Sequence, residues 1–146
     1  MKLNGVHLLE KNVKEFGNLK DEEKSEIIDF CMLWSFVEGE YLNEHATVNT
    51  IGTFVKNLER DGELSKLKLD KHVQYFRNRY FLNRKFTAFY RTLYLERSAS
   101  SPQVSLKLRE DGFTASQRLI GCLVIIYRFI SNLFHGVNGN ITIMNN

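Results

Sequence analysis

The stretch Leu119-Ile120-Gly121-Cys122-Leu123-Val124-Ile125-Ile126 carries no charged or strongly polar side chain. It lies in the last strongly helical segment, which we expect to begin near Thr114 or Ser116 and to end near His135. Gly136 follows and can adopt the left-handed conformation that closes a helix. A helix that is apolar all round is buried in a core or at a subunit contact. The stretch therefore predicts a helix that is central to the fold or lies at a subunit contact.

Three further helices are predicted upstream of the central one. The first runs from about Asp21 to Leu42, and its acidic start suits the positive end of a helix dipole. The second covers about Glu44 to Arg60, with Asn43 available as its cap, and the third covers about Asp70 to Leu95 with an aromatic-rich face. The alternating residues Val104 to Leu108 indicate a short strand or extended loop. The pattern predicts an all-α fold, an up-down four-helix bundle with a short extended excursion before the last helix.

Composition is consistent with one globular domain over residues 1–146. The 146 residues, with a hydrophobic share of 43%, are enough to bury a substantial core. The N-terminus has no signal-peptide core, and the longest unbroken apolar run, Cys122 to Tyr127, is too short to span a bilayer. Cys31 and Cys122 lie in apolar helical patterns without a second cysteine at metal-ligand spacing. We expect reduced thiols, a cytoplasmic protein, and no membrane, metal or cofactor.

Charge is distributed unevenly along the chain. Residues 21–63 contain eleven acidic and three basic residues, a balance of −8, whereas residues 66–97 contain nine basic and two acidic residues, a balance of +7. Segments of opposite sign can attract each other within a bundle, and a basic segment can also bind an anionic polymer. The distribution permits nucleic-acid binding without requiring it.

A polar stripe interrupts the end of the predicted central helix. Arg128 and His135 are seven residues apart, so two helical turns, about 10 Å, separate them on nearly the same face. Ser131 and Asn132 lie between them on that face. Histidine is suited to proton transfer near neutral pH, and arginine is suited to holding a phosphate. The structural alternative is a histidine favoured at a helix C-terminus and an arginine whose head pairs with an acid of the first or second helix.

Other motifs point away from several enzyme classes. His7, His45 and His72 are interpreted as surface or capping residues, and Glu38, Glu40 and Glu44 as a solvated acidic face. The sequence has no glycine-rich phosphate loop and no Gly-x-Ser-x-Gly turn, which argues against ATP hydrolysis and serine-hydrolase chemistry.

Two stretches resemble the HEPN superfamily, the higher eukaryotes and prokaryotes nucleotide-binding domains. Arg128 followed by Ile130-Ser131-Asn132-Leu133-Phe134-His135-Gly136 resembles the family's arginine-to-histidine motif, here with a gap of six residues. Leu33-Trp34-Ser35-Phe36-Val37-Glu38 in the first helix looks like a stretch of some abortive-infection-type members. Phe129 departs from the family pattern, in which the residue after the arginine is commonly polar.

The resemblance implies a metal-independent endoribonuclease of a toxin–antitoxin or phage-defence system. The RNA 2′-hydroxyl would attack the adjacent phosphate, with His135 as base or acid, Arg128 as electrostatic clamp, and Ser131 and Asn132 orienting the phosphate or the imidazole. One helix offers one histidine for two proton transfers, so two chains would form a composite site in a homodimer, with the apolar last helix as a reason for pairing. Backbone contacts to RNA and stacking surfaces are expected from the basic segment: Arg77, Arg84, Lys85 and Arg91, with Tyr75, Tyr80 and Tyr90.

Two other hypotheses remain open at this point. Phe129 favours a non-catalytic HEPN module that binds a nucleotidyltransferase partner, a nucleotide or RNA. Alternatively, the chain is an unrelated helical scaffold in which Arg128 and His135 are structural. An antitoxin partner belongs only to the first hypothesis.

Overall fold

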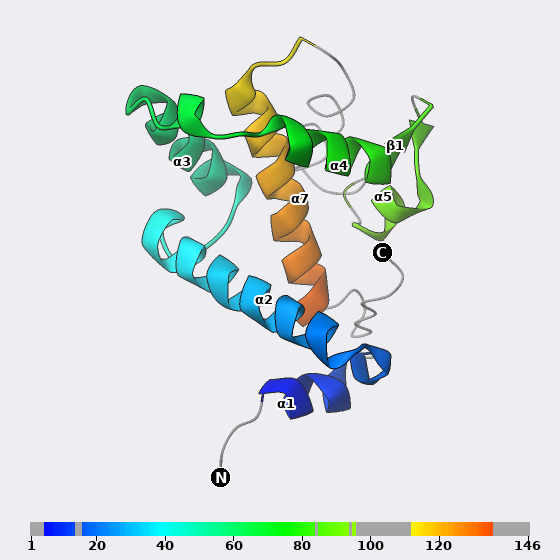
Figure 1. Cartoon of the computed structure of the whole chain (residues 1–146). Coiled ribbons are helices and arrows are strands. Elements are labelled where there is room, and N and C mark those ends of the chain that lie inside the picture. Colours follow the sequence, from blue (N-terminus) through cyan, green and yellow to red (C-terminus); the bar gives the residue numbers. More distant parts are fainter. Residues whose placement is uncertain (1–4, 14–15, 84, 94, 96–111, 136–146) are drawn as a thin grey trace.

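The computed structural model describes residues 5–13, 16–83, 85–93, 95 and 112–135 (Figure 1). These residues are mostly helical, which confirms the predicted class. The predicted excursion at Val104 to Leu108 lies outside the described residues. The elements in chain order are α1 (Gly5–Asn12), η1 (Phe16–Asn18), α2 (Asp21–Tyr41), α3 (Val48–Arg60), η2 (Leu64–Lys66), α4 (Asp70–Tyr80), β1 (Phe81–Leu82), β2 (Lys85–Phe86), α5 (Ala88–Thr92) and α7 (Ala115–His135).

Helix α7 is the centre of the fold, as its apolar stretch predicts. Val124 and Ile125 are completely or almost completely buried, and Cys122 is buried beside them. Helices α3 and α4 both pack against α7, and the main core cluster joins α7 to residues of α2, α3, α4 and α5. The free energy of burying this stretch therefore holds elements together that are far apart in the sequence.

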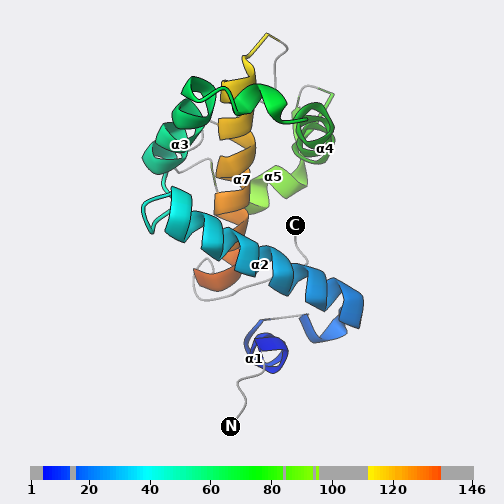
Figure 2. The same ribbon diagram turned by 60° about the vertical axis from the view of Figure 1, so that its left-hand side comes forward.

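The up-down arrangement of four helices is not confirmed. In Figure 1, α4 runs across α7, and in Figure 2 α4 is seen nearly end-on while α7 stands upright. Helix α2 crosses the lower part of α7 obliquely in both views. The helices thus surround α7 at steep angles, whereas an up-down bundle has nearly parallel and antiparallel axes.

The prediction of one continuous helix from Asp70 to Leu95 is wrong. Helix α4 ends at Tyr80, and an antiparallel hairpin follows in which Phe81 pairs with Phe86 and Leu82 with Lys85. Asn83 begins the two-residue turn with a φ of 51°, a left-handed conformation that asparagine tolerates better than most residues.

Aromatic packing explains why the hairpin replaces the helix. The rings of Phe81 and Phe86 are 4.5 Å apart across the strands, and Phe86 stacks on the buried Tyr90 of α5 at 3.8 Å. The Thr87 hydroxyl group donates to the Arg79 carbonyl at 2.7 Å and fixes the return of the chain toward α4. Folding the segment back on itself thus packs Phe81 and Phe86 against the buried Tyr90, whereas Phe89 stays 43% exposed.

The beginning of α3 also differs from the prediction. Thr47, and not Asn43, caps the helix: its side-chain oxygen accepts a hydrogen bond from the Thr50 N–H at 3.0 Å. Asn43 and Glu44 instead adopt left-handed conformations, with φ of 54° and 68°, in the turn between α2 and α3. Two successive non-glycine residues with positive φ are unusual outside a turn that other contacts stabilise.

Helix α2 matches its predicted bounds within one residue, but much of its apolar surface is exposed. Met32, Leu33 and Phe36 are 70%, 61% and 58% exposed and lie on one face of the helix. Lys24 and Trp34 are the residues that α2 buries most completely. Trp34 is thus the principal attachment of α2 to the core around α7.

Both cysteines are free thiols, as predicted, with Cys31 half-buried and Cys122 buried. Burial raises the pKa of both thiols, and it raises the pKa of Cys122 to about 12. The folded protein therefore opposes ionisation of Cys122 at a pH where an unfolded chain would already carry the thiolate.

The hairpin turn gives a first prediction. Asn83→Gly is expected to retain or increase stability, whereas Asn83→Val is expected to lower the free energy of unfolding by about 1–2 kcal/mol, because a β-branched residue is strained at positive φ. Urea unfolding followed by circular dichroism measures both values. Equal stability of the two variants would contradict the assigned turn.

Alkaline pH gives a second prediction. Burial raises the pKa of Cys122 to about 12 in the folded state, so the folded state holds the thiol proton more tightly than the unfolded state does. This contribution to the free energy of unfolding is complete below the unfolded-state pKa and is lost progressively as the pH rises toward about 12. The free energy of unfolding is expected to fall with pH above about 9. Tyr80, whose pKa burial also raises, adds to the same trend. The fall should be shallower in Cys122→Ala, and an unchanged slope in urea titrations at successive pH values would contradict burial of the thiol.

Candidate functional site

A cavity of about 540 Å³ lies between α2 and α7 and is closed by the turn that leads into α3. We call it the motif cavity, because both HEPN-like stretches contribute to it. Its lining residues are Trp34, Ser35 and Glu38 of α2, His45 and Ala46 of the turn, and Tyr127, Ile130 and Ser131 of α7. Two segments separated by about ninety residues of sequence thus meet at one hollow.

Trp34 forms part of the apolar wall of the motif cavity. It is only 4% exposed, and its indole Nε1–H has no hydrogen-bond partner among the residues that the structure describes. Such an unsatisfied buried donor is costly, since it has lost its hydrogen bonds to water. A polar group or water within the motif cavity would be the natural acceptor for this donor.

Glu38 organises the turn that closes the motif cavity. Its carboxylate accepts a hydrogen bond from the Ala46 N–H at 2.9 Å, and its carbonyl oxygen accepts from the N–H groups of Leu42 and Glu44 at 3.2 and 3.0 Å. These bonds support the left-handed residues Asn43 and Glu44. The interpretation of Glu38 as part of a solvated acidic face is therefore wrong, although Glu40 and Glu44 are exposed as expected.

Sequence reasoning did not assign His45 to the site. It is exposed on the turn and lines the motif cavity together with Ser131. The Thr50 hydroxyl group donates to the His45 carbonyl at 2.8 Å and fixes the backbone at this position. Eighty-odd residues separate His45 from Ser131, so no local spacing in the sequence relates them.

The side chains of the polar stripe on α7 face two different places, the end of α5 and the motif cavity. The Arg128 Nε–H donates to the Leu93 carbonyl at 3.3 Å, and the Asn132 amide donates to the Thr92 carbonyl at 3.1 Å. Ser131 instead lines the motif cavity. Arg128 and Asn132 thus hold the end of α5. The ion pairs among the described residues include none between Arg128 and an acidic residue of α2 or α3, which is the pairing that the structural alternative expects.

His135 is the last residue of α7, one turn beyond Ser131 and Asn132. Its backbone is helical as predicted, and its side chain lies outside the part of the structure that is described. Its catalytic role and its distance from Arg128 therefore stay predictions.

The predicted RNA-binding residues fall on three elements. Arg77 is half-buried on α4, while Lys85 of β2 and Arg91 of α5 are exposed; Arg84 lies outside the described residues. The carbonyl groups of Thr92 and Leu93 accept hydrogen bonds from the polar stripe on α7. Arg91 directly precedes them, so it is the predicted RNA-binding residue nearest in sequence to these contacts. Of the three tyrosines proposed for stacking, only Tyr75 is exposed, since Tyr80 and Tyr90 belong to the core.

Within the described residues, no group of three or more histidine, cysteine, aspartate or glutamate side chains is placed to hold a metal ion. None of the helices in that part of the chain has the length and apolar character needed to cross a bilayer. No protein-family model, curated protein or solved structure matches the chain.

Glu38 gives a third prediction. Glu38→Ala is expected to lower the free energy of unfolding by about 1.5 kcal/mol, because the Ala46 N–H loses a charged acceptor in a partly buried position. Glu40→Ala, an exposed change on the same helix, is the matched control and should be nearly neutral. Thermal and urea unfolding measure both. Equal effects of the two substitutions would show that Glu38 does not hold the turn.

Proposed function

We propose that the chain is a metal-independent endoribonuclease of the HEPN type, acting in a toxin–antitoxin or phage-defence system. The observation that carries the proposal is the meeting of the two HEPN-like stretches at the motif cavity, which is lined by Trp34, Ser35 and Glu38 of one stretch and by Ile130 and Ser131 of the other. The two stretches are remote in sequence, and the packing of Trp34 into the core around α7 brings them to one cavity.

The proposed chemistry is cleavage by the substrate's own 2′-hydroxyl group. A base removes the 2′-hydroxyl proton, the 2′-oxygen bonds to phosphorus, and the bond from phosphorus to the 5′-oxygen breaks. The leaving oxygen takes a proton from an acid, so the products are a 2′,3′-cyclic phosphate and a 5′-hydroxyl end. His135 serves as base or acid, and positive charge stabilises the pentavalent transition state.

Arg128 is suited to supply that charge while it holds α5. Its hydrogen bond to Leu93 uses the Nε–H, and the guanidinium carries further N–H donors on its two Nη atoms that suit a phosphate. Ser131, in the motif cavity, offers a hydroxyl group to orient the scissile linkage. Arg91, exposed at the end of α5, would contact the RNA backbone.

A homodimer completes the proposal, because one chain has a single histidine on the stripe for two proton transfers. The apolar centre of α7 does not provide the dimer surface, since Val124 and Ile125 are buried within the protomer. The exposed side chains of Met32, Leu33 and Phe36 on α2 are the better surface, because they form an apolar patch on the helix that borders the motif cavity.

The proposal gives a fourth prediction. His135→Ala and Arg128→Ala are each expected to reduce RNA cleavage by about a hundredfold or more. His7→Ala, an exposed histidine on α1, is the matched control and should cleave like the parent. Denaturing gels of a mixed RNA panel, with and without chelator, measure the rate, and end-group analysis identifies the cyclic phosphate. Light scattering and circular dichroism confirm that each variant remains folded and dimeric. Parent-like cleavage by His135→Ala would reject the proposal.

A non-catalytic HEPN module is the second candidate. It is favoured by the engagement of Arg128 and Asn132 with α5 and by Phe129, which faces an apolar groove. It would bind a nucleotidyltransferase, a nucleotide or RNA. Absence of cleavage over the panel by the parent protein, together with retained RNA or nucleotide binding, would select this candidate. If the parent protein neither cleaves RNA nor binds RNA or nucleotides, the chain is a helical scaffold in which Arg128 is structural.

A further inference from the structure

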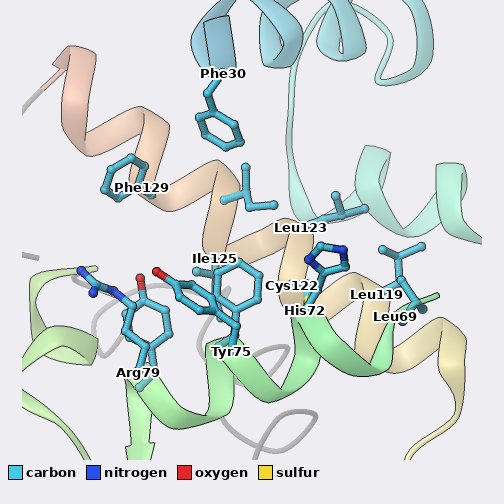
Figure 3. A pocket seen from close by; sticks show the side chains of 13 residues that line it. Phe30, Leu69, His72, Tyr75, Arg79, Leu119, Cys122, Leu123, Ile125 and Phe129 are labelled. Atoms are coloured by element: carbon cyan, nitrogen blue, oxygen red, sulfur yellow. The ribbon is translucent and has the colours of Figure 1, made fainter. Parts of the chain in front are cut away.

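A second cavity, which shares no lining residue with the motif cavity, lies between α4 and α7 (Figure 3). We call it the apolar groove. Its volume is about 540 Å³, within the range of small-molecule sites. Most of its lining is hydrocarbon or aromatic, and Figure 3 shows Phe30 of α2 reaching over it. The apolar lining includes Phe30, Leu69, Phe76, Leu119, Leu123 and Phe129.

The crossing of α4 over α7 explains why the apolar groove exists. Leu123, Ile126 and Phe129 follow one face of α7 and are only half-buried, because α4 diverges from α7 and α2 contributes only Phe30 there. An open apolar hollow exposes hydrocarbon to water at a cost in free energy. An occupant with an apolar body would remove that exposure.

The polar groups of the apolar groove lie mainly at one end. Figure 3 shows the guanidinium group of Arg79 and the Tyr75 side chain together below Phe129, with His72 toward the opposite end near Leu69. Arg79 is positioned by aromatic rings, with its guanidinium carbon 4.4 Å from the Phe89 ring centre and 5.8 Å from that of Tyr80.

The charge at this end favours a negative group. Arg79 is the permanent cation of the lining, and no aspartate or glutamate is among the described residues that line the groove. The Tyr80 hydroxyl group carries its proton at neutral pH, as tyrosine ordinarily does, and burial raises its pKa further. A carboxylate near Arg79 would therefore meet a cation and phenol donors.

We propose that the apolar groove binds a free single-chain carboxylate, its hydrocarbon chain lying along Leu123 and Ile126 and its head group at Arg79. One cation at one end suits one head group, and the elongated apolar lining suits one chain. The site is separate from the proposed ribonuclease site and does not depend on that activity.

Isothermal titration with hexanoate, octanoate and decanoate, each below its micelle concentration, tests the proposal. Affinity is expected to rise about fourfold for each added methylene, equivalent to about 0.8 kcal/mol, until the groove is filled. Decyltrimethylammonium, with the same chain length and the opposite charge, should bind at least tenfold more weakly than decanoate. Equal binding of the two amphiphiles, or no dependence on chain length, would overturn the proposal.

Paired variants locate the site. Arg79→Gln should weaken decanoate binding about tenfold or more, whereas Lys71→Gln, an exposed change on the same helix outside the groove, should not. Phe30→Ala should weaken binding severalfold, and Leu33→Ala, exposed on the same helix, should leave it unchanged. Binding that Leu33→Ala lowers and Phe30→Ala does not would place the ligand on the outer face of α2 and overturn the proposal.

One further measurement separates the free ligand from other occupants. Sedimentation with phosphatidylglycerol vesicles should show no stable binding, and decanoate should not change the oligomeric state. Vesicle binding that decanoate prevents would identify a membrane surface as the occupant. Dissociation of a dimer by decanoate would identify a second copy of the chain. Either result would overturn the proposal.

Discussion

Burial of the apolar centre of α7 is the constraint on which the rest of the structure depends. Leu119 to Ile126 has apolar side chains on every side of the helix, and α3, α4 and the α5 segment bury most of them around α7. Their steep crossing angles bury the helix but do not close every gap. The apolar groove lies where α4 diverges from α7, and the motif cavity lies between α2 and α7, so both are consequences of this arrangement.

Helix α2 is attached by few contacts of different kinds. Trp34 provides the buried apolar contact, and Glu38 provides the polar contact by holding the turn before α3. Both residues belong to the stretch that resembles HEPN domains, and both attach the helix and line the motif cavity. A substitution there would change the cavity's shape together with the stability of the fold, and activity measurements alone would not separate the two effects.

The sequence predicts elements whose signals are local and misses those set by distant contacts. The periodicity of α2 and the apolar run of α7 are strong local signals, and both helices are found within a few residues of their predicted bounds. The hairpin after Tyr80 was not predicted, because aromatic residues at helical spacing fit a helix until Phe81, Phe86 and Tyr90 pack on one another. In the same way, Ser131 was identified from the stripe, but its neighbour His45 depends on how α2 meets α7.

The division of the polar stripe bears directly on the roles that the proposed ribonuclease assigns to Arg128 and Asn132. Asn132 uses its amide donor to hold Thr92, so it is a positioning residue more readily than a phosphate ligand. Arg128 differs, because a guanidinium has five N–H donors and its bond to Leu93 uses one. Tethering by Nε also restricts the side chain, which lowers the entropy lost when the Nη groups bind a phosphate. The contact that makes Arg128 structural is therefore compatible with its use as a clamp, and it explains why α5, with the exposed Arg91, lies beside the stripe.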